Sequence, residues 1–317
     1  MITMVITTYN EAGNIGDLVR DITGQSRVPD ELLIVDGGST DGTVAEINEA
    51  AASSSAPSLK VRVIVEQGAN VPEGRNMAIG AASHECVCVT DAGCRLDSEW
   101  CERITSPILQ GNADMVGGFY QPRATSRFQR VLASITTRPE PGRSFLPSSR
   151  SIAFTKSLWE RVGGYPEWLR WGEDTLFNET CIESGARYVV APDAIVGWEV
   201  RPNLRAVVKQ FFNYARGDGQ RCMKSAAYAA DILIAVVALA ILAAGRVWGL
   251  LIPIFYAGLI LSRHPSQVPL NDLPAALGLA VVIRTLRAAG FVVGAIDSRC
   301  GVAGRDRDED PGAGKGL

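Results

Sequence analysis

The sequence lacks several features that would assign it to a common class of protein. Its formal net charge is −3, whereas nucleic-acid-binding domains usually carry a basic surface, so no nucleic-acid partner is expected. Its seven cysteines form no C-x-x-C pair, which favours buried, reduced thiols over a disulfide framework or a zinc site. No G-x-G-x-x-G follows the first predicted strand, which argues against a dinucleotide-binding oxidoreductase.

The beginning of the chain also lacks the features of an export signal. A secretory signal has a basic stretch followed by a longer apolar run, whereas residues 1–8 lead directly into a strand-like segment. We therefore expect the N-terminal domain to remain in the cytoplasm.

Short apolar runs alternate with helical patterns through the first two thirds of the chain. Each run is followed by a turn or a helix-start signal, which is typical of strands buried on both faces. This alternation predicts an α/β domain with a mainly parallel sheet and helices on both faces. The predicted strands are 2–7, 32–35, 61–65, 86–90, 115–119, 151–155, 187–190 and 195–199, and the predicted helices are 13–22, 43–52, 75–82, 98–109 and one that begins near Glu173.

A proline-rich segment interrupts this pattern at residues 138–150. It contains three prolines, one glycine and three arginines, a composition typical of a loop. We expect this loop to act as a mobile lid over a site.

Long apolar stretches begin after residue 222. Residues 226–244 contain one charged residue, Asp231, residues 247–261 contain none, and residues 273–296 contain Arg284 and Arg287. A bilayer-spanning helix needs about 20 apolar residues, so we predict a transmembrane hairpin from the first two stretches. Two arginines at mid-membrane would be costly, which leaves the third stretch open between spanning the membrane and lying on it.

Six basic residues precede the first apolar stretch, and a positive flank predicts the cytoplasmic side of a membrane. We therefore expect a cytoplasmic catalytic domain over residues 1–222, a membrane region over 223–298 and a disordered tail over 299–317. The alternative for the apolar region is a buried helical hairpin in a soluble core. The six basic residues are Arg201, Arg205, Lys209, Arg216, Arg221 and Lys224.

Two polar motifs follow the first two predicted strands. They read TTYNE at residues 7–11 and VDGGSTDGT at residues 35–43. In an open α/β sheet, ligands bind beyond the carboxyl ends of the strands, and paired glycines let a ligand approach the backbone. We predict that Asp36 hydrogen-bonds a base or a ribose. For Asn10, Ser39 and Asp41, the alternative is a purely structural role in turns and helix starts.

Two acidic motifs occur further along the chain. TDAG at residues 90–93 ends a strand with Asp91, where an acid can hold Mg²⁺ or Mn²⁺ against a leaving diphosphate. GED at residues 172–174 places Glu173 and Asp174 at a helix start, where the helix dipole favours an ionised carboxylate. Such a carboxylate can act as a general base toward an acceptor hydroxyl. Taken alone, each acid would more often be a turn cap or a first-turn acid that stabilises a helix, and the order of the four motifs is what favours a catalytic site.

Together the motifs resemble family 2 of the glycosyltransferases, an inverting family with the GT-A fold. The resemblance runs from residue 2 to about residue 220 and implies a nucleotide-diphosphate sugar as donor. It also implies that Asp91 holds the donor diphosphate or its metal, and that Glu173 and Asp174 are the catalytic acids, with Asp174 as base. GRN at residues 74–76 resembles the family's helix-start segment near the nucleotide. The implied nucleotide-binding residues are therefore Thr8, Asn10, Glu11, Asp36 and Arg75.

Two departures from the family pattern bear on the mechanism. Gly93 stands where the Asp-x-Asp element has its second acid, which leaves Asp91, with Glu173 or a water, to hold a metal. The Gln-x-x-Arg-Trp element of processive synthases is absent, and residues 213–220 read NYARGDGQ. We therefore expect transfer of a single sugar. Arg216 is expected to bind an acceptor phosphate or an anionic lipid headgroup.

The apolar segments favour an acceptor that is lipid-linked or presented at the membrane. The alternative is a non-catalytic membrane scaffold or sensor that retains the nucleotide-sugar fold, a reading that Gly93 encourages. Replacing Asp174 separates the two, because a scaffold would keep its function and an enzyme would lose most of its turnover.

Overall fold

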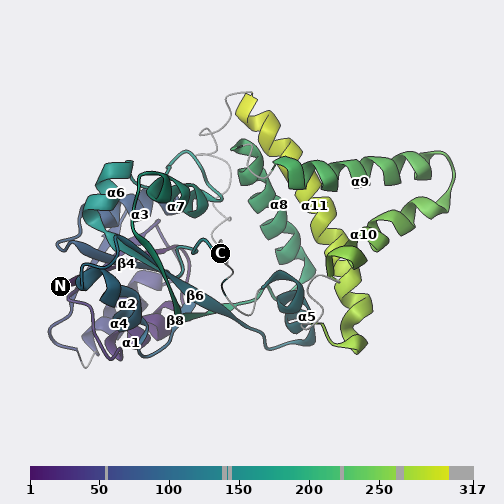
Figure 1. Cartoon of the computed structure of the whole chain (residues 1–317). Coiled ribbons are helices and arrows are strands. Elements are labelled where there is room, and N and C mark those ends of the chain that lie inside the picture. The colour runs from purple at the N-terminus through teal and green to yellow at the C-terminus, as the bar shows by residue number, and fades with distance from the viewer. Residues whose placement is uncertain (54–55, 138–140, 142–144, 222–224, 262–267, 300–317) are drawn as a thin grey trace. The chain divides into compact units, whose positions relative to one another are not determined.

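The computed structural model describes residues 1–53, 56–137, 141, 145–221, 225–261 and 268–299, and Figure 1 shows the elements. The chain divides into two compact units, Met1–Gln121 with Pro139–Glu199, and Pro122–Arg138 with Val200–Arg305. The predicted domain boundary at residue 222 stays a prediction. Of the predicted lid, residues 138–140 and 142–144 lie outside the described residues, as do residues 300–317 of the predicted tail.

The first unit contains an eight-stranded sheet in the order β3-β2-β1-β4-β7-β6-β8-β5. The β1, β2, β3 and β4 strands pair in parallel, whereas the β4–β7, β6–β7 and β5–β8 pairs are antiparallel. The predicted α/β class is confirmed, with a sheet that is mixed rather than mainly parallel, because an apolar run reads the same in either strand direction. The strands are β1 (Ile2–Thr8), β2 (Glu31–Asp36), β3 (Lys60–Val65), β4 (Cys86–Asp91), β5 (Cys94–Leu96), β6 (Met115–Arg123), β7 (Ile152–Thr155) and β8 (Tyr188–Glu199).

Helices cover both faces of this sheet, as predicted (Figure 1). In the first helix, Ile15, Leu18 and Ile22 recur at a spacing of three to four residues and are fully buried, which is the pattern of a helix with one apolar face. One face of the sheet is covered by α1 (Ile15–Thr23), α2 (Thr43–Ala52) and α4 (Trp100–Leu109), and the other by α3 (Val71–Gly80), α6 (Lys156–Val162) and α7 (Glu173–Glu183).

The last strand differs from its prediction. We predicted two strands at 187–190 and 195–199, whereas β8 is continuous from Tyr188 to Glu199. Pro192 and Asp193, which are typical of turns, lie inside this strand and are exposed. The short β5 and α6 were not predicted, since three and seven residues are too few to establish a period.

The second unit is helical. Between α8 and α11, a Cβ on Gly290 would clash with the carbonyl oxygen of Phe212, and one on Gly294 with that of Arg216. Small residues at such positions let two helix backbones approach closely. The elements are α5 (Arg127–Thr136), α8 (Leu204–Gln220), α9 (Ser225–Ala243), η1 (Val247–Leu250), α10 (Leu251–Leu261), η2 (Leu270–Asp272) and α11 (Leu273–Arg299).

Two helical segments among the described residues are long and apolar enough to cross a membrane, judged by length and composition. They are Ala226–Ala243 and Leu270–Arg299, whereas the apolar helix Val247–Leu259 is shorter. The predicted hairpin joined the first segment to the short one. By length, the two candidate membrane-crossing segments are instead the first and the third. For the third, the sequence left open whether it spans the membrane or lies on it.

The arginines of the third segment contact one acid of the first. Arg284 Nη1 lies 3.2 Å from Asp231 Oδ1, and Arg287 Nε lies 3.4 Å from Asp231 Oδ2. Tyr256 also donates a hydrogen bond to Asp231, whose side chain is fully buried. Pairing inside the helical unit lowers the cost of placing these charges among apolar helices.

Candidate active site

Three parallel strands end at one edge of the sheet and bring predicted site residues together. The register pairs Thr8 with Asp36, and Thr7 with Asp91, across β1, β2 and β4. Thr8 is buried, and its hydroxyl has no hydrogen-bond partner among the described residues. The motifs TTYNE, VDGGSTDGT and TDAG therefore lie at one edge of the sheet. In open α/β sheets, this is the edge at which ligands bind.

Asp36 organises the loop that follows β2. Its Oδ1 accepts hydrogen bonds from the backbone N–H groups of Gly38 at 3.0 Å and Ser39 at 2.8 Å, and its Oδ2 accepts one from the Ser39 hydroxyl. Gly38 has a φ of 94°, and a Cβ there would lie 2.7 Å from Gln67 Cδ, so the turn requires glycine. Asp36 is fully buried, and its predicted contact with a nucleotide stays a prediction.

Asn10 and Glu11 join the loop after β1 to the same network. Asn10 Oδ1 accepts a hydrogen bond from Thr40 N–H at 2.9 Å, and Asn10 N–H donates to the Ser39 hydroxyl at 2.8 Å. Glu11 N–H donates to Thr43 Oγ1 at 2.8 Å. Asn10 has a φ of 52°, a left-handed conformation that asparagine tolerates better than most residues. These contacts give Asn10 and Ser39 a structural role, and the nucleotide contacts of Asn10 and Glu11 stay predictions.

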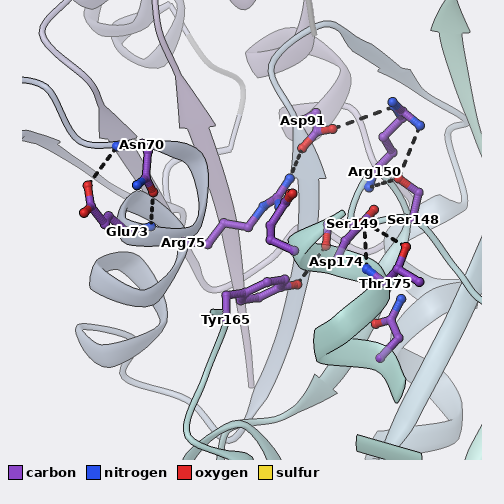
Figure 2. Close-up of polar contacts among 12 residues, drawn as sticks. Asn70, Glu73, Arg75, Asp91, Ser148, Ser149, Arg150, Tyr165, Asp174 and Thr175 are labelled. Atoms are coloured by element: carbon purple, nitrogen blue, oxygen red, sulfur yellow. Dashed lines mark hydrogen bonds and ion pairs between the residues drawn. The ribbon is translucent and has the colours of Figure 1, made fainter. Parts of the chain in front are cut away.

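Arg75 lies at the centre of a polar cluster beside the end of β4 (Figure 2). It donates hydrogen bonds to Asp91 Oδ1 and Glu173 Oε1, both at 2.7 Å. Its guanidinium carbon lies 5.3 Å from the ring centroid of Tyr165, within the range of a cation–π contact. Burial disfavours the charge of Arg75, but the carboxylates of Asp91 and Glu173 raise its pKa above the ordinary value. The cluster therefore holds a permanent positive charge between Asp91 of the TDAG motif and Glu173 of the GED motif.

The first turns of α3 hold Arg75 in place. Asn70 Oδ1 accepts a hydrogen bond from Glu73 N–H at 2.9 Å, and Glu73 Oε2 accepts one from Asn70 N–H at 3.0 Å, which completes a capping box. Asn76 donates to Tyr165 O and accepts from Tyr165 N–H, both at 2.8 Å. The helix start and the segment that carries Tyr165 are thus joined on either side of Arg75.

Glu173 is the first residue of α7 and is buried against Arg75. Burial, and then the charge of Asp174, raise the pKa of Glu173 to about 7, while Arg75 opposes the shift. The carboxyl group therefore titrates near neutral pH. The contact with Arg75 fixes the position of the Glu173 carboxyl group, and its predicted catalytic role stays a prediction.

Asp174, the predicted base, is the second residue of α7. The helix begins directly after Gly172, which has a φ of 79°. Asp174 Oδ1 accepts a hydrogen bond from Thr175 N–H at 2.7 Å, and Oδ2 accepts one from Ser149 N–H at 3.4 Å (Figure 2). Acids in the first turn are favoured by the helix dipole, so α7 and the loop before β7 orient this carboxylate together.

The donor set around Asp91 does not fit a divalent metal site in this arrangement. Oδ1 of Asp91 accepts a hydrogen bond from Arg75, and Oδ2 lies 3.8 Å from Arg150 Nε, while Gly93 supplies no second carboxylate. Within the described ranges, no group of three or more His, Cys, Asp or Glu residues could hold a metal ion. Mg²⁺ and related hard cations need several oxygen ligands, and the described residues around Asp91 do not supply them.

Two members of the cluster were not predicted. Tyr165 stacks on Phe177 with a centroid separation of 4.1 Å, and its hydroxyl hydrogen-bonds the Ser149 hydroxyl at 2.9 Å. Arg150 ends the proline-rich segment, whose three arginines were the available signal. That composition indicated a loop, without distinguishing one arginine from the others.

The fold and the cluster together define an α/β protein with a candidate ligand site at the carboxyl ends of its parallel strands. The model of the family "Glycosyl transferase family 2" matches residues 3–188, which is more than half of the chain. The chain therefore belongs to glycosyl transferase family 2, and it is a glycosyltransferase.

Similar proteins agree with this assignment. Glycosyltransferase AglE of Haloferax volcanii is 29% identical over 221 residues, which cover 66% of this chain and 70% of that protein. Mannosyltransferase PcManGT of Pyrobaculum calidifontis, solved with GDP-Man and Mn²⁺, is 22% identical with a TM-score of 0.60, over 94% of this chain and 86% of that one. Residues 1–349 of S. aureus TarS, solved with UDP-GlcNAc, are 18% identical with a TM-score of 0.51, over 95% of this chain and 92% of that one. At these identities the solved structures establish the fold alone, the predicted GT-A fold.

Proposed function

We propose that this glycosyltransferase is an inverting enzyme that transfers a single sugar from a nucleotide-diphosphate sugar to a lipid-linked or membrane-presented acceptor. The observation that carries the proposal is the cluster in which Arg75 joins Asp91 to the acid pair Glu173 and Asp174. A positive charge beside the donor site and a carboxylate on a helix start are the two groups that an inverting transfer needs.

The chemistry is a single displacement at the anomeric carbon. The acceptor oxygen forms a bond to that carbon, and Asp174 takes the proton that the hydroxyl loses. The glycosidic bond of the donor breaks, and its electron pair goes to the diphosphate oxygen. Arg75, held by Asp91 and Glu173, supplies a fixed positive charge that stabilises the leaving group without reorganisation.

The donor class is supported by the solved relatives, which contain GDP-Man and UDP-GlcNAc. In this chain the proposed nucleotide contacts come from the loops after β1 and β2, at the edge that Asp91 shares. The buried hydroxyl of Thr8, which has no partner among the described residues, supports a ligand at this edge.

The membrane part of the proposal is supported by the apolar segments Ala226–Ala243 and Leu270–Arg299. The basic residues between 201 and 224 support a cytoplasmic catalytic unit, since positive flanks stay on that side. An amphiphilic acceptor could then diffuse along the bilayer surface to the enzyme.

The test is a transfer assay with the full chain in native membranes, across a panel of UDP- and GDP-sugars, with lipid-linked and soluble acceptors. We expect one donor to be used with a lipid-linked acceptor, and Asp174→Asn to lower turnover by about 10²- to 10⁴-fold. Asp97→Asn is the matched control, because its side chain is 45% exposed and it contacts Arg103 on α4. Full turnover by Asp174→Asn would refute the assignment of the base.

Further readouts test the finer parts of the proposal. The anomeric configuration of the product, read by NMR, should be opposite to that of the donor, and retention would refute a single displacement. The product mass should increase by one sugar, and a ladder of masses would refute single addition. Equal turnover of a soluble acceptor without membranes would refute the membrane-presented acceptor.

A further inference from the structure

Arg150 occupies the side of Asp91 opposite Arg75 (Figure 2). Its Nε lies 3.8 Å from Asp91 Oδ2, and its side chain is 13% exposed. Nη1 and the backbone N–H both donate hydrogen bonds to the Ser148 hydroxyl, at 3.3 Å and 3.4 Å. Asp91 is therefore bracketed by two guanidinium groups.

Two aromatic rings fix the direction of the Arg150 side chain. Its guanidinium carbon lies 4.7 Å from the ring centroid of Trp198 and 5.7 Å from that of Tyr120, and the two rings meet edge to face at 6.4 Å. Both rings project from strands, β8 and β6. A cation stacked on rings that are held by a sheet loses little further freedom when it binds an anion.

This aromatic platform adjoins the position at which the chain lacks an acid. Trp198 pairs with Cys94 in the β5–β8 ladder, and Cys94 directly follows Gly93. The carboxylate that the family pattern has at residue 93 is absent. Instead, the guanidinium of Arg150 stacks on the ring of Trp198 in the adjoining strand. A guanidinium has five N–H donors in one plane, and this planar fork matches phosphate oxygens.

We propose that Arg150 is a leaving-group residue, whose guanidinium binds the diphosphate of the donor and stabilises the charge that develops there. In the step described above, the electron pair of the broken glycosidic bond passes to the diphosphate oxygen, and Arg150 donates hydrogen bonds to that diphosphate. Asp91 then serves to hold both arginines. The inference rests on the proposed function, and it assigns to a side chain the charge neutralisation that a metal ion provides when two acids are present.

The test compares Arg150→Ala, Arg150→Gln and Arg150→Lys with the wild-type full chain. Arg20→Ala is the matched control, because its side chain is 65% exposed and it pairs with Asp17 on α1. Binding of UDP and GDP, and of uridine and guanosine, is measured by calorimetry in detergent with EDTA. Steady-state kinetics use the donor found in the panel.

We expect Arg150→Ala and Arg150→Gln to weaken diphosphate binding by about 10- to 100-fold, the usual effect of losing a charge-assisted hydrogen bond. Nucleoside binding should not change, kcat should fall, and Arg150→Lys should recover part of both losses. The melting temperature identifies any variant that fails to fold, and Arg150→Lys, which keeps the charge, then provides the comparison.

If wild-type protein binds a diphosphate, three results would still overturn the inference: unchanged diphosphate binding in Arg150→Ala and Arg150→Gln, equal loss of nucleoside binding, or wild-type turnover that EDTA abolishes and Mn²⁺ restores. The binding arm separates this inference from the proposed function. Wild-type protein that binds a diphosphate through Arg150 but turns over no donor would support the residue and refute the activity. Wild-type protein that binds no diphosphate would refute both.

Discussion

Replacement of Arg75 by methionine is the sharpest test of the polar cluster. Methionine retains much of the apolar length of the side chain and removes the cation that Asp91 and Glu173 share at 2.7 Å each. Removing one partner of a buried ion pair costs about 3 to 5 kcal/mol. Glu173, whose side chain is 11% exposed, carries most of this cost, because Asp91 is 21% exposed and keeps its contact with Arg150.

The size of this loss should depend on pH. Without Arg75, which opposes the upward shift, the pKa of Glu173 rises further above the value of about 7. A folded-state pKa above that of the unfolded chain gives stability that is present at low pH and lost as the pH rises through the folded pKa. The variant should therefore lose more stability, relative to wild type, at pH 8 than at pH 6.

Urea unfolding followed by tryptophan fluorescence measures the effect, because five of the six tryptophans lie in the first unit. The double variant Arg75→Met with Glu173→Gln should recover about 2 kcal/mol of the loss, since it removes the buried carboxylate that has lost its cationic partner. A loss below about 1 kcal/mol for Arg75→Met, or no recovery in the double variant, would refute the account of a shared buried cation.

Three further predictions follow from contacts in the first unit. Glu173→Gln should flatten the rise of kcat/KM that we expect in wild type through about pH 7, the pKa of this carboxyl, and a parallel pH profile would refute the assignment. It should also gain thermal stability relative to wild type as the pH rises. In wild type the stability contributed by the neutral carboxyl is full below pH 4.5, its ordinary pKa, and is lost as the pH rises through the folded-state pKa of about 7. Gly118→Ala should lose about 3 kcal/mol of unfolding free energy, since its Cβ would meet Ser151 Oγ and lie 2.6 Å from Ala194 O. Gly80→Ala, whose Cβ would lie 3.9 Å from its nearest neighbour, should be close to neutral in the same urea titration. Asp36→Asn should lower the unfolding free energy by about 1 kcal/mol, because it removes the charge that accepts the loop N–H groups, and an unchanged midpoint would contradict this.

Local patterns predicted the elements that carry the motifs. Buried parallel strands are continuous apolar runs, so β1, β2 and β4 were predicted to within one residue at each end. The start of α3 was four residues off, at Val71 instead of residue 75. Its capping box at Asn70 and Glu73 is a helix-start signal that the sequence contains, and the prediction overlooked it.

The direction of the strands in the second half of the sheet depends on contacts that no local pattern contains. The β4 strand pairs antiparallel with β7, more than sixty residues later in the chain. Only the packing of the whole sheet decides that direction, so the mixed character of the sheet was not predicted. The same applies to β8, in which exposed Pro192 and Asp193 are tolerated inside a strand although both residues usually indicate a turn.

The candidate site illustrates the same limit at the level of chemistry. Glu173 and Asp174 were predicted as one catalytic pair, because adjacent acids look alike in a sequence. The structure gives them different contacts through a residue 98 positions away: Arg75 holds Glu173, while Asp174 accepts a hydrogen bond from the loop before β7. Arg75 was itself expected only to contact a nucleotide. A cation shared by two carboxylates can hold the end of β4 and the start of α7 in a fixed relation, so the coupling of Asp91 to Glu173 depends on the fold and not on any local pattern.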